Sequence, residues 1–160
     1  MEVIRRAALA LAAAMLATVG LASAALATTP ATGAGAFVPA GPPTTLSTRT
    51  ADGNTIITQV QKYIDTGLLT GTEIDTVTFT FHPNGTFNFR ADVAYTGTVA
   101  GRPGTLSQHF EGTGDATSFH GQIQTVSGTG ALANLHGQGT FVGSSITGAG
   151  TYSFRYHFDP

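Results

Sequence analysis

Apolar and polar residues alternate one by one along several short stretches of the chain from residue 44 onward. In the clearest stretch, Val77, Phe79 and Phe81 alternate with threonines. A period of two is typical of β-strands, because successive side chains of a strand point to opposite faces of the sheet. Glycines punctuate these stretches, and helical periodicity is absent from most of the chain. The pattern therefore predicts an all-β domain.

Turn-forming residues separate the stretches and predict how the strands connect. Residues 75–82 and 86–99 form a predicted hairpin around Pro83-Asn84-Gly85, where Asn-Gly is typical of a type I′ turn with positive φ angles. Further turns are predicted at residues 101–104 and 112–115, and a closing strand at residues 150–158. Strands joined in this way predict an up-and-down meander.

Residues 54–69 are the most ambiguous segment, because their apolar residues also fit a helical spacing. Their β-branched content favours a strand, and Gly67 and Gly71 oppose a helix. With this segment included, about eight strands are predicted, which suits a single closed antiparallel β-barrel. Closure also removes the free edges along which such a Thr- and Phe-rich chain would aggregate.

A glycine-rich block at residues 127–139 interrupts the strand pattern. Its segment G-T-G-A-L-A, residues 128–133, matches the dinucleotide-binding pattern G-x-G-x-x-A. A phosphate-binding loop must open a helix, however, and further glycines interrupt the residues that follow. The block instead predicts a structural corner, with Leu132 and Leu135 filling one end of the core.

Residues 1–27 have the three parts of an export signal. Arg5 and Arg6 form a positive start, residues 7–21 form an apolar run, and small residues follow. Two Ala-x-Ala sites predict cleavage after Ala24 or after Ala27. Because the run is Ala-rich and short for a membrane span, we expect cleavage and a secreted or extracytoplasmic product without a span.

Residues 28–43 are rich in Ala, Thr, Gly and Pro and contain no charged residue. A segment of this composition buries too little apolar surface to order itself, so the sequence predicts a flexible leader. The β-barrel domain is then expected to span residues 44–160, a size at which a single core can be stable.

Composition argues against a nucleic-acid partner and excludes disulfide bonds. Charged residues make up only 10% of the chain, and the net charge is −2. The Lys and Arg residues are scattered, whereas nucleic-acid binding requires them to be clustered. We therefore expect no nucleic-acid partner. The chain has no cysteine and thus no disulfide, and its composition leaves the oligomeric state open.

Aromatic residues on the predicted strands supply the candidate ligand-binding side chains. Tyr152, Phe154 and Tyr156 alternate with polar residues on the last strand and fit either a cavity lining or, more readily, an ordinary core. The tyrosines keep a cavity as the alternative, because a buried phenol needs a hydrogen-bond partner and would place polar groups in the lumen. The predicted ligand-binding residues are Phe89, Tyr95, Phe110, Tyr152, Phe154 and Tyr156.

His109 and Glu111 are the nearest approach to a polar functional pair. They lie two residues apart and hence on one face of a predicted strand, where they could form half of a metal site or an acid–base pair. A solvated outer face explains them better, because Leu106 and Phe110 occupy the opposite face, the expected inner one.

Other reactive groups are sparse. Glu73 and Asp75 also share a strand face, but no sequence feature marks that face as a cleft. The histidines lack the spacing of a metal site and no cofactor motif remains, so we expect neither a metal nor a cofactor. Without cysteine and without a G-x-S-x-G motif, hydrolase chemistry is disfavoured.

The second half of the chain resembles a known family. The segment G-R-P-G at residues 101–104, the strand with His109 and Phe110, the glycine-rich block and the terminal Y-x-F-x-Y strand are similar to the bacterial domain-of-unknown-function family 3224. The resemblance implies a small closed β-barrel like those of allene oxide cyclases and dirigent proteins. Some of those barrels use a hydrophobic lumen to direct cyclisation or coupling of small molecules. The family has no established activity and supplies no catalytic residues.

These observations lead to three hypotheses of function. The first is an exported β-barrel that binds a small apolar or amphipathic molecule in its lumen. The second is a cyclase or isomerase that acts on a reactive small molecule there. The third is a non-catalytic envelope or interaction protein with a filled barrel. An interior packed solid would exclude the first two, and convergent polar groups with shifted pKa values in a cavity would favour the enzyme.

Overall fold

Nine antiparallel strands make up the part of the chain that the computed structural model describes, residues 29–160. The strands are β1 (Ala31–Pro39), β2 (Thr44–Ala51), β3 (Asn54–Gly67), β4 (Leu69–Phe81), β5 (Phe87–Val99), β6 (Arg102–Gly114), β7 (Ser118–Gly130), β8 (Leu135–Ser144) and β9 (Gly150–Phe158). No helix in the described residues has the length and hydropathy to cross a membrane. The export signal predicted at residues 1–27, with its cleavage sites, lies outside the described residues.

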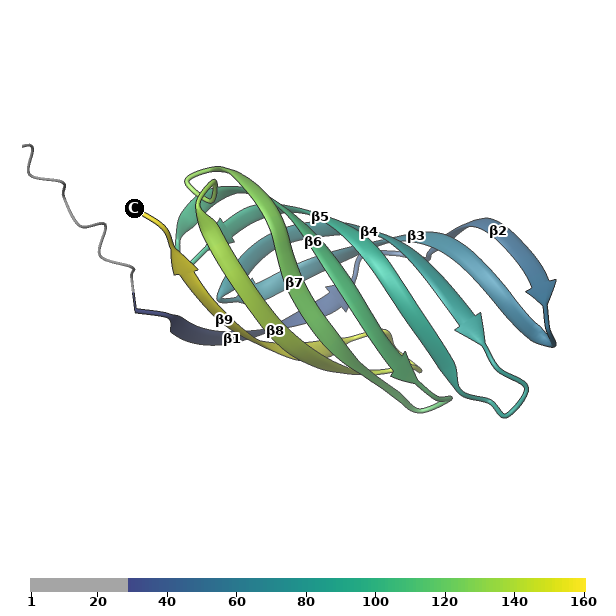
Figure 1. Cartoon of the computed structure of the whole chain (residues 1–160). Coiled ribbons are helices and arrows are strands. Elements are labelled where there is room, and N and C mark those ends of the chain that lie inside the picture. The colour runs from purple at the N-terminus through teal and green to yellow at the C-terminus, as the bar shows by residue number, and fades with distance from the viewer. Residues whose placement is uncertain (1–28) are drawn as a thin grey trace, which may run out of the picture.

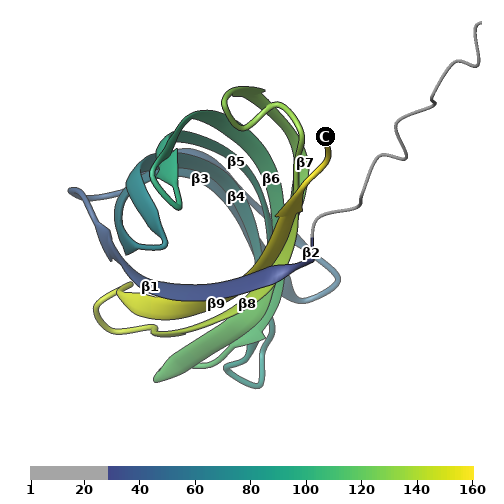
Figure 2. The same ribbon diagram turned by 90° about the vertical axis from the view of Figure 1, so that its left-hand side faces the viewer.

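Strand pairing closes the sheet on itself. Each strand from β2 to β8 pairs with the next along the chain, and β1 pairs with both β9 and β3. Eight strands, β1 and β3 to β9, therefore form a barrel, which Figure 2 shows almost along its axis. β2 pairs with the first half of β3 and extends beyond the barrel (Figure 1). The predicted all-β fold, the meander and the closed antiparallel barrel are confirmed, as is a strand at residues 54–69.

The predicted flexible leader at residues 28–43 is wrong, because Ala31–Pro39 form strand β1. β1 pairs with β9 along most of its length and with β3 along its C-terminal half. The composition of this segment did not reveal the strand, because its backbone hydrogen-bond partners lie on two strands that are distant in the sequence, β3 and β9. Gly35 permits the close approach, since a Cβ there would collide with the Thr66 carbonyl. The barrel domain thus begins with β1 and not at Thr44.

The predicted hairpin at residues 75–99 is confirmed, but its type I′ turn is wrong. Within the turn only Gly85 has a positive φ, of 86°. The Gly85 N–H donates to the His82 carbonyl at 3.0 Å, and the Asn84 side chain accepts from the Thr86 N–H at 3.1 Å. Asn84 therefore stabilises the turn through its side-chain oxygen and not through a left-handed backbone.

A hydrophobic core fills one end of the barrel. Leu132 and Leu135, predicted to fill an end of the core, are 0% and 3% exposed. Gly130 turns the chain before them with a φ of 62°, which confirms the structural corner. The core cluster consists of Leu69, Tyr95, Val99, Leu106, Ile123, Leu132, Leu135, Phe141, Tyr152 and Phe154. Burial of each such side chain contributes about 1.5–3 kcal/mol, so this end anchors the barrel.

Candidate functional site

A cavity of about 710 Å³ lies inside the barrel. Its walls come from all eight barrel strands, and its rim from the turns that follow β1, β4, β6 and β8. At its inner end it meets the core cluster, four members of which also line the cavity: Leu69, Ile123, Phe141 and Tyr152. The barrel is therefore filled at one end and hollow at the other.

Phenylalanine rings form much of the cavity wall. The Phe89 ring lies 5.6 Å from that of Phe79 and 5.9 Å from that of Phe141, centroid to centroid. Separations of this size are typical of packed aromatic pairs. The phenylalanines that line the cavity are Phe37, Phe79, Phe81, Phe87, Phe89, Phe110, Phe119 and Phe141. We call this set the phenylalanine wall, and it suits the apolar part of a ligand.

Three carboxyl groups also line this cavity, next to the filled end. Asp65 on β3 and Glu73 and Asp75 on β4 are 3%, 5% and 7% exposed. The register places Tyr63 opposite Glu73 and Gln61 opposite Asp75. Because side chains alternate between the two faces of a strand, this register puts all five on the inner face. We call Asp65, Glu73 and Asp75 the lumen acids.

Burial controls the ionisation of the lumen acids. It raises the pKa of Asp65 to about 7 and that of Asp75 to about 8, and it raises the pKa of Glu73 well above its usual range. Repulsion between the carboxylates adds to the rise for Glu73 and Asp75. No Lys or Arg among residues 29–160 lines the cavity. The ion pairs in that range join a histidine to an aspartate at the surface.

Several buried polar atoms around the acids lack a hydrogen-bond partner within the described residues. They include Asp65 Oδ2, Asp75 Oδ1 and both polar atoms of the Gln108 side chain. Gln108 is 1% exposed and lines the same cavity. It pairs in register with Val93, which in turn pairs with Asp75. An unpaired buried group costs about 1–3 kcal/mol, so a polar ligand group at this place would be stabilising.

The lumen acids support two kinds of chemistry. A protonated carboxyl can donate a proton or a hydrogen bond, whereas an ionised one attracts a cation. Tyr63 lies beside them, and burial, followed by the charges of Asp75 and Glu73, raises its pKa so that it remains a hydroxyl donor. Within residues 29–160, no three His, Cys, Asp or Glu side chains are arranged to hold a metal ion.

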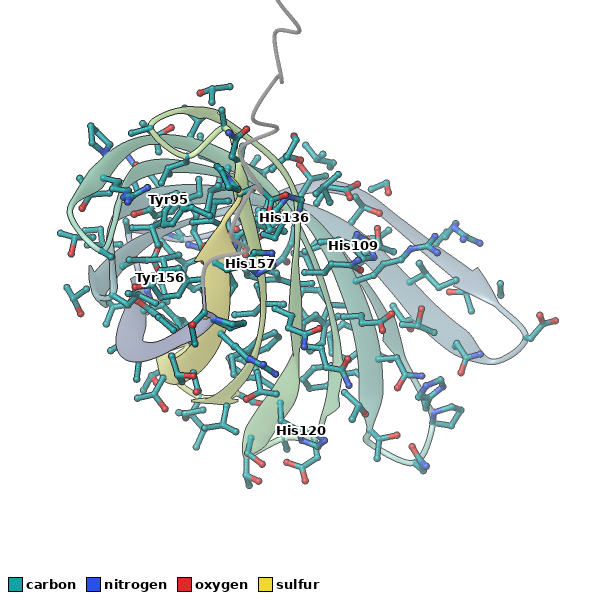
Figure 3. The ribbon with its side chains drawn as sticks, turned by 60° about the vertical axis from the view of Figure 1, so that its left-hand side comes forward. Tyr95, His109, His120, His136, Tyr156 and His157 are labelled. Atoms are coloured by element: carbon teal, nitrogen blue, oxygen red, sulfur yellow. The ribbon has the colours of Figure 1, made fainter. Side chains whose placement is uncertain are left out.

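The structure separates the six aromatic residues that the sequence predicts to bind ligand. Phe89, Phe110 and Tyr152 line the cavity. Tyr95 and Phe154 lie in the core cluster, and Tyr156 packs against it. Figure 3 accordingly shows Tyr95 and Tyr156 far from His120, which is near the turn between β6 and β7.

The tyrosine hydroxyls bind backbone groups. The Tyr95 hydroxyl donates to the Thr98 carbonyl at 2.7 Å. The Tyr152 hydroxyl accepts from the Leu69 N–H at 2.8 Å and lies 3.1 Å from the Thr66 carbonyl oxygen. These phenols therefore hold the filled end together. Besides the carboxyls and amides, the Tyr63 hydroxyl also lines the cavity.

His109 and Glu111 lie on the outer face of β6 and do not line this cavity. His109 Nδ1 is 3.2 Å from Asp92 Oδ1, and the Asp92 side chain is 90% exposed. Glu111 pairs in register with Arg90 of β5. The structure thus gives each of the two residues a different neighbour at the surface.

Strand pairing brings together two histidines that are distant in the sequence. His136 on β8 and His157 on β9 are register partners, and their rings stack 5.2 Å apart. His136 Nε2 lies 3.0 Å from Asp159 Oδ2. Figure 3 shows the two histidines side by side and well away from His120. None of these three residues lines the cavity.

The sequence did contain a signal for the lumen acids. Val77 and Phe79 mark the inner face of β4, and the alternation extends back from them to Asp75 and Glu73. If the same alternation of inward and outward side chains is traced four residues back from Val77, both acids point into the barrel. Asp65 carried no comparable signal, because only the pairing of β3 with β4 shows which way it faces.

Comparisons with known proteins agree with this fold. The model of the family described as "Protein of unknown function (DUF3224)" matches residues 33–156. A crystal structure of a protein with unknown function from that family, from Shewanella oneidensis MR-1, is similar with a TM-score of 0.59 and 21% sequence identity. The match covers 82% of this chain and 98% of that chain. No curated protein matches the chain.

Proposed function

The chain belongs to the DUF3224 family of proteins of unknown function, as its resemblance predicted, and we propose that it binds a small amphipathic molecule in its lumen. The observation that carries this proposal is the cavity of about 710 Å³. Small-molecule sites commonly have volumes of about 300–1,000 Å³. We also propose that the protein is exported, on the basis of the signal pattern at residues 1–27, so that it meets this molecule outside the cytoplasm.

The lining supports an amphipathic ligand. The phenylalanine wall matches an apolar body, and the lumen acids with Gln108 match a polar end. A ligand that buries about 200 Å² of apolar surface gains roughly 5 kcal/mol before the costs of immobilisation. Apolar contact supplies affinity, and the few polar groups fix orientation.

Fluorescence titration with N-phenyl-1-naphthylamine tests this proposal, because the emission of this small neutral fluorophore rises in apolar surroundings. Ala91 lines the cavity on β5 and is 3% exposed, so Ala91→Leu narrows the lumen. Ala94 is exposed on the outer face of the same strand, and Ala94→Leu is the matched control. We expect saturable binding that Ala91→Leu weakens about tenfold by overpacking the site, with Ala94→Leu unchanged. Absence of saturable binding, or equal binding by both variants, contradicts the proposal.

Native mass spectrometry of protein purified from its own host then identifies the ligand. A retained small molecule of reproducible mass, lost from Ala91→Leu and kept by Ala94→Leu, would place it in the lumen. A molecule kept equally by both variants would bind elsewhere.

A second candidate function is a cyclase or isomerase that acts in the same lumen. The observation that favours it is the group of lumen acids, because buried carboxyls with raised pKa values are suited to acid–base catalysis near neutral pH. The sequence resemblance to the DUF3224 family implies a barrel like those of allene oxide cyclases and dirigent proteins, some of which direct such reactions. Conversion of the retained molecule by the wild-type protein and not by Asp75→Asn, with both proteins saturated with that molecule, would support this function. No conversion by the wild-type protein would refute this function, and equal conversion by both proteins would refute the role of Asp75.

The third hypothesis, a filled barrel that acts only through its surface, has the least support. It requires an interior occupied by side chains, and the lumen at the rim end is open.

A further inference from the structure

We propose that the ligand of the lumen is an amphipathic cation, an organic ammonium. Its charged nitrogen lies among Asp65, Glu73 and Asp75, and its apolar body lies against the phenylalanine wall. This inference rests on the proposed function, because it presupposes that the lumen takes up a small molecule.

The first observation is the lack of a cation beside three buried acids. The lumen acids are at most 7% exposed, and no cationic side chain of residues 29–160 lines their cavity. Buried carboxyls are normally paired with a cation or kept neutral, because ionisation away from water is costly. A ligand ammonium would supply the missing positive charge.

The second, independent observation is Gln108. Its side chain is 1% exposed, lines the cavity, and has no partner for either polar atom within the described residues. Its carbonyl oxygen, Asp65 Oδ2 and Asp75 Oδ1 are three unpaired acceptors. A primary ammonium has three N–H donors and no acceptor, so its hydrogen-bonding capacity matches this set.

Other ligand classes fit this lining less well. An anion would find no positive partner, because no Lys or Arg of residues 29–160 lines the cavity, and an apolar molecule would leave the oxygens of the lumen acids unpaired. A metal ion would leave the phenylalanine wall uncovered. Aromatic faces such as those of Phe89 and Phe110 also attract organic cations, so the wall and the acids favour the same ligand.

Binding of an ammonium is linked to ionisation of the acids. Because burial raises the pKa of Asp65 to about 7 and that of Asp75 to about 8, the empty site at neutral pH holds Asp75 mostly protonated and Asp65 partly protonated. A cation favours the ionised form, so binding releases protons, and affinity rises from about pH 6 to 9 while the ammonium stays charged. The other titratable groups that line the cavity are Tyr63 on β3, Tyr152 on β9 and Asp115 at the rim. Tyr95 on β5 faces Asp65 from the core.

These neighbours do not titrate in that pH range. Burial raises the pKa values of Tyr63, Tyr95 and Tyr152, so all three phenols remain neutral. Hydrogen bonds from Thr117 and Ser118 lower the pKa of Asp115 to about 2, so it remains ionised. The proton release is therefore assigned to the lumen acids.

Calorimetric titration with three molecules of one carbon skeleton tests the inference: 4-phenylbutylammonium, 4-phenylbutan-1-ol and 4-phenylbutyrate. We expect the ammonium to bind about tenfold or more tightly than the alcohol, the effect of one charge-assisted hydrogen bond, and the carboxylate to bind most weakly. Titration in two buffers of different ionisation enthalpy should show proton release with the ammonium and none with the alcohol.

Variants test whether the preference for ammonium arises at the lumen acids. Asp75→Asn and Glu73→Gln are close in size to the native residues and remove a buried ionisable group, so both are expected to fold, which circular dichroism verifies. Each should weaken binding of the ammonium much more than binding of the alcohol, so that the tenfold preference largely disappears. Asp92→Asn, at a side chain that is 90% exposed, is the control and should keep the preference.

The outcomes separate this inference from the proposed function. No preference for the ammonium, while N-phenyl-1-naphthylamine binds in the lumen, overturns the inference and leaves the proposed function standing. A preference that survives in both lumen variants also overturns it. Failure of every probe, the fluorophore included, overturns both.

Discussion

The hydroxyl of Tyr152 on β9 accepts a hydrogen bond from the backbone N–H of Leu69, at the start of β4, with a length of 2.8 Å. β9 and β4 are not neighbours in the sheet, so the bond crosses the interior of the barrel. The two residues are 6% and 5% exposed, which leaves water no easy access to either group. Both line the inner end of the cavity, and their contact therefore closes the floor of the candidate site.

Removal of this hydroxyl should destabilise the barrel. Tyr152→Phe leaves the buried Leu69 N–H without that partner, and the free energy of unfolding should fall by about 1–3 kcal/mol. Urea denaturation followed by tyrosine fluorescence measures the change. Tyr156→Phe is the control, because no hydrogen bond of the Tyr156 hydroxyl occurs within residues 29–160. It should shift stability by less than about 0.5 kcal/mol. Equal effects of the two variants would contradict this role of Tyr152.

Truncation of a core leucine at the filled end should lower stability by leaving a void. Leu132 is fully buried at the glycine-rich corner, so Leu132→Ala creates a void and should lower the free energy of unfolding by about 2–5 kcal/mol. Val126→Ala, at a side chain that is 66% exposed, removes apolar atoms without a void. Denaturation midpoints that shift equally for both would show that the corner does not anchor the core.

A chain that begins at Thr44 should not form a stable barrel. It lacks β1, which leaves the paired edges of β3 and β9 open and removes Phe37 from the cavity wall. Open strand edges promote association between chains. We expect aggregation by light scattering and a lower melting temperature than for a chain that begins at Thr29. Two monomeric chains of equal stability would show that β1 is dispensable.

Stability should decrease as pH rises from about 4 to 8. In the folded state Asp65 and Asp75 keep their protons up to about pH 7 and 8, because burial raises both pKa values. In the unfolded state they lose them near pH 4. Folding thus takes up protons in this window, and each group lowers stability by at most about 1.4 kcal/mol per pH unit. The contribution of these two carboxyls to stability is therefore complete below about pH 4. It is lost once the pH rises above their pKa values in the folded state.

Urea denaturation at pH 5 and pH 8 tests this dependence. Asp75→Asn should flatten the pH profile, because asparagine has no proton to exchange. Asp92→Asn, at the exposed side chain on β5, should leave the profile as in the wild type. A profile for Asp75→Asn identical to that of the wild type would falsify the assignment of the slope to this carboxyl.

Local patterns predicted those features that depend on neighbouring residues. Val77, Phe79 and Phe81 showed the strand and its inner face, and the glycines before Leu132 showed a corner whose leucines fill the core. Alternation and turn chemistry act over a few residues, so a sequence can express them directly.

The candidate site was less accessible to sequence reasoning. The aromatic residues Phe89, Phe110 and Tyr152 were identified and do line the cavity, but Tyr95, Phe154 and Tyr156 were identified by the same alternation and belong to the filled end. An inward-facing side chain lies in the core or in a cavity according to its height along the barrel axis. That height follows from strand register, which is a property of pairs of strands.

By itself, the sequence determined an all-β chain of short strands joined by tight turns, because each of these features arises within a few consecutive residues. Tertiary structure decided that Ala31–Pro39 close the barrel, since the free edges of β3 and β9 exist only after both strands have folded. It also decided that Asp65 on one strand meets Glu73 and Asp75 on the next inside a hollow lumen. Register and closure place these groups together, and burial then raises their pKa values and makes the lumen a candidate site for a cation.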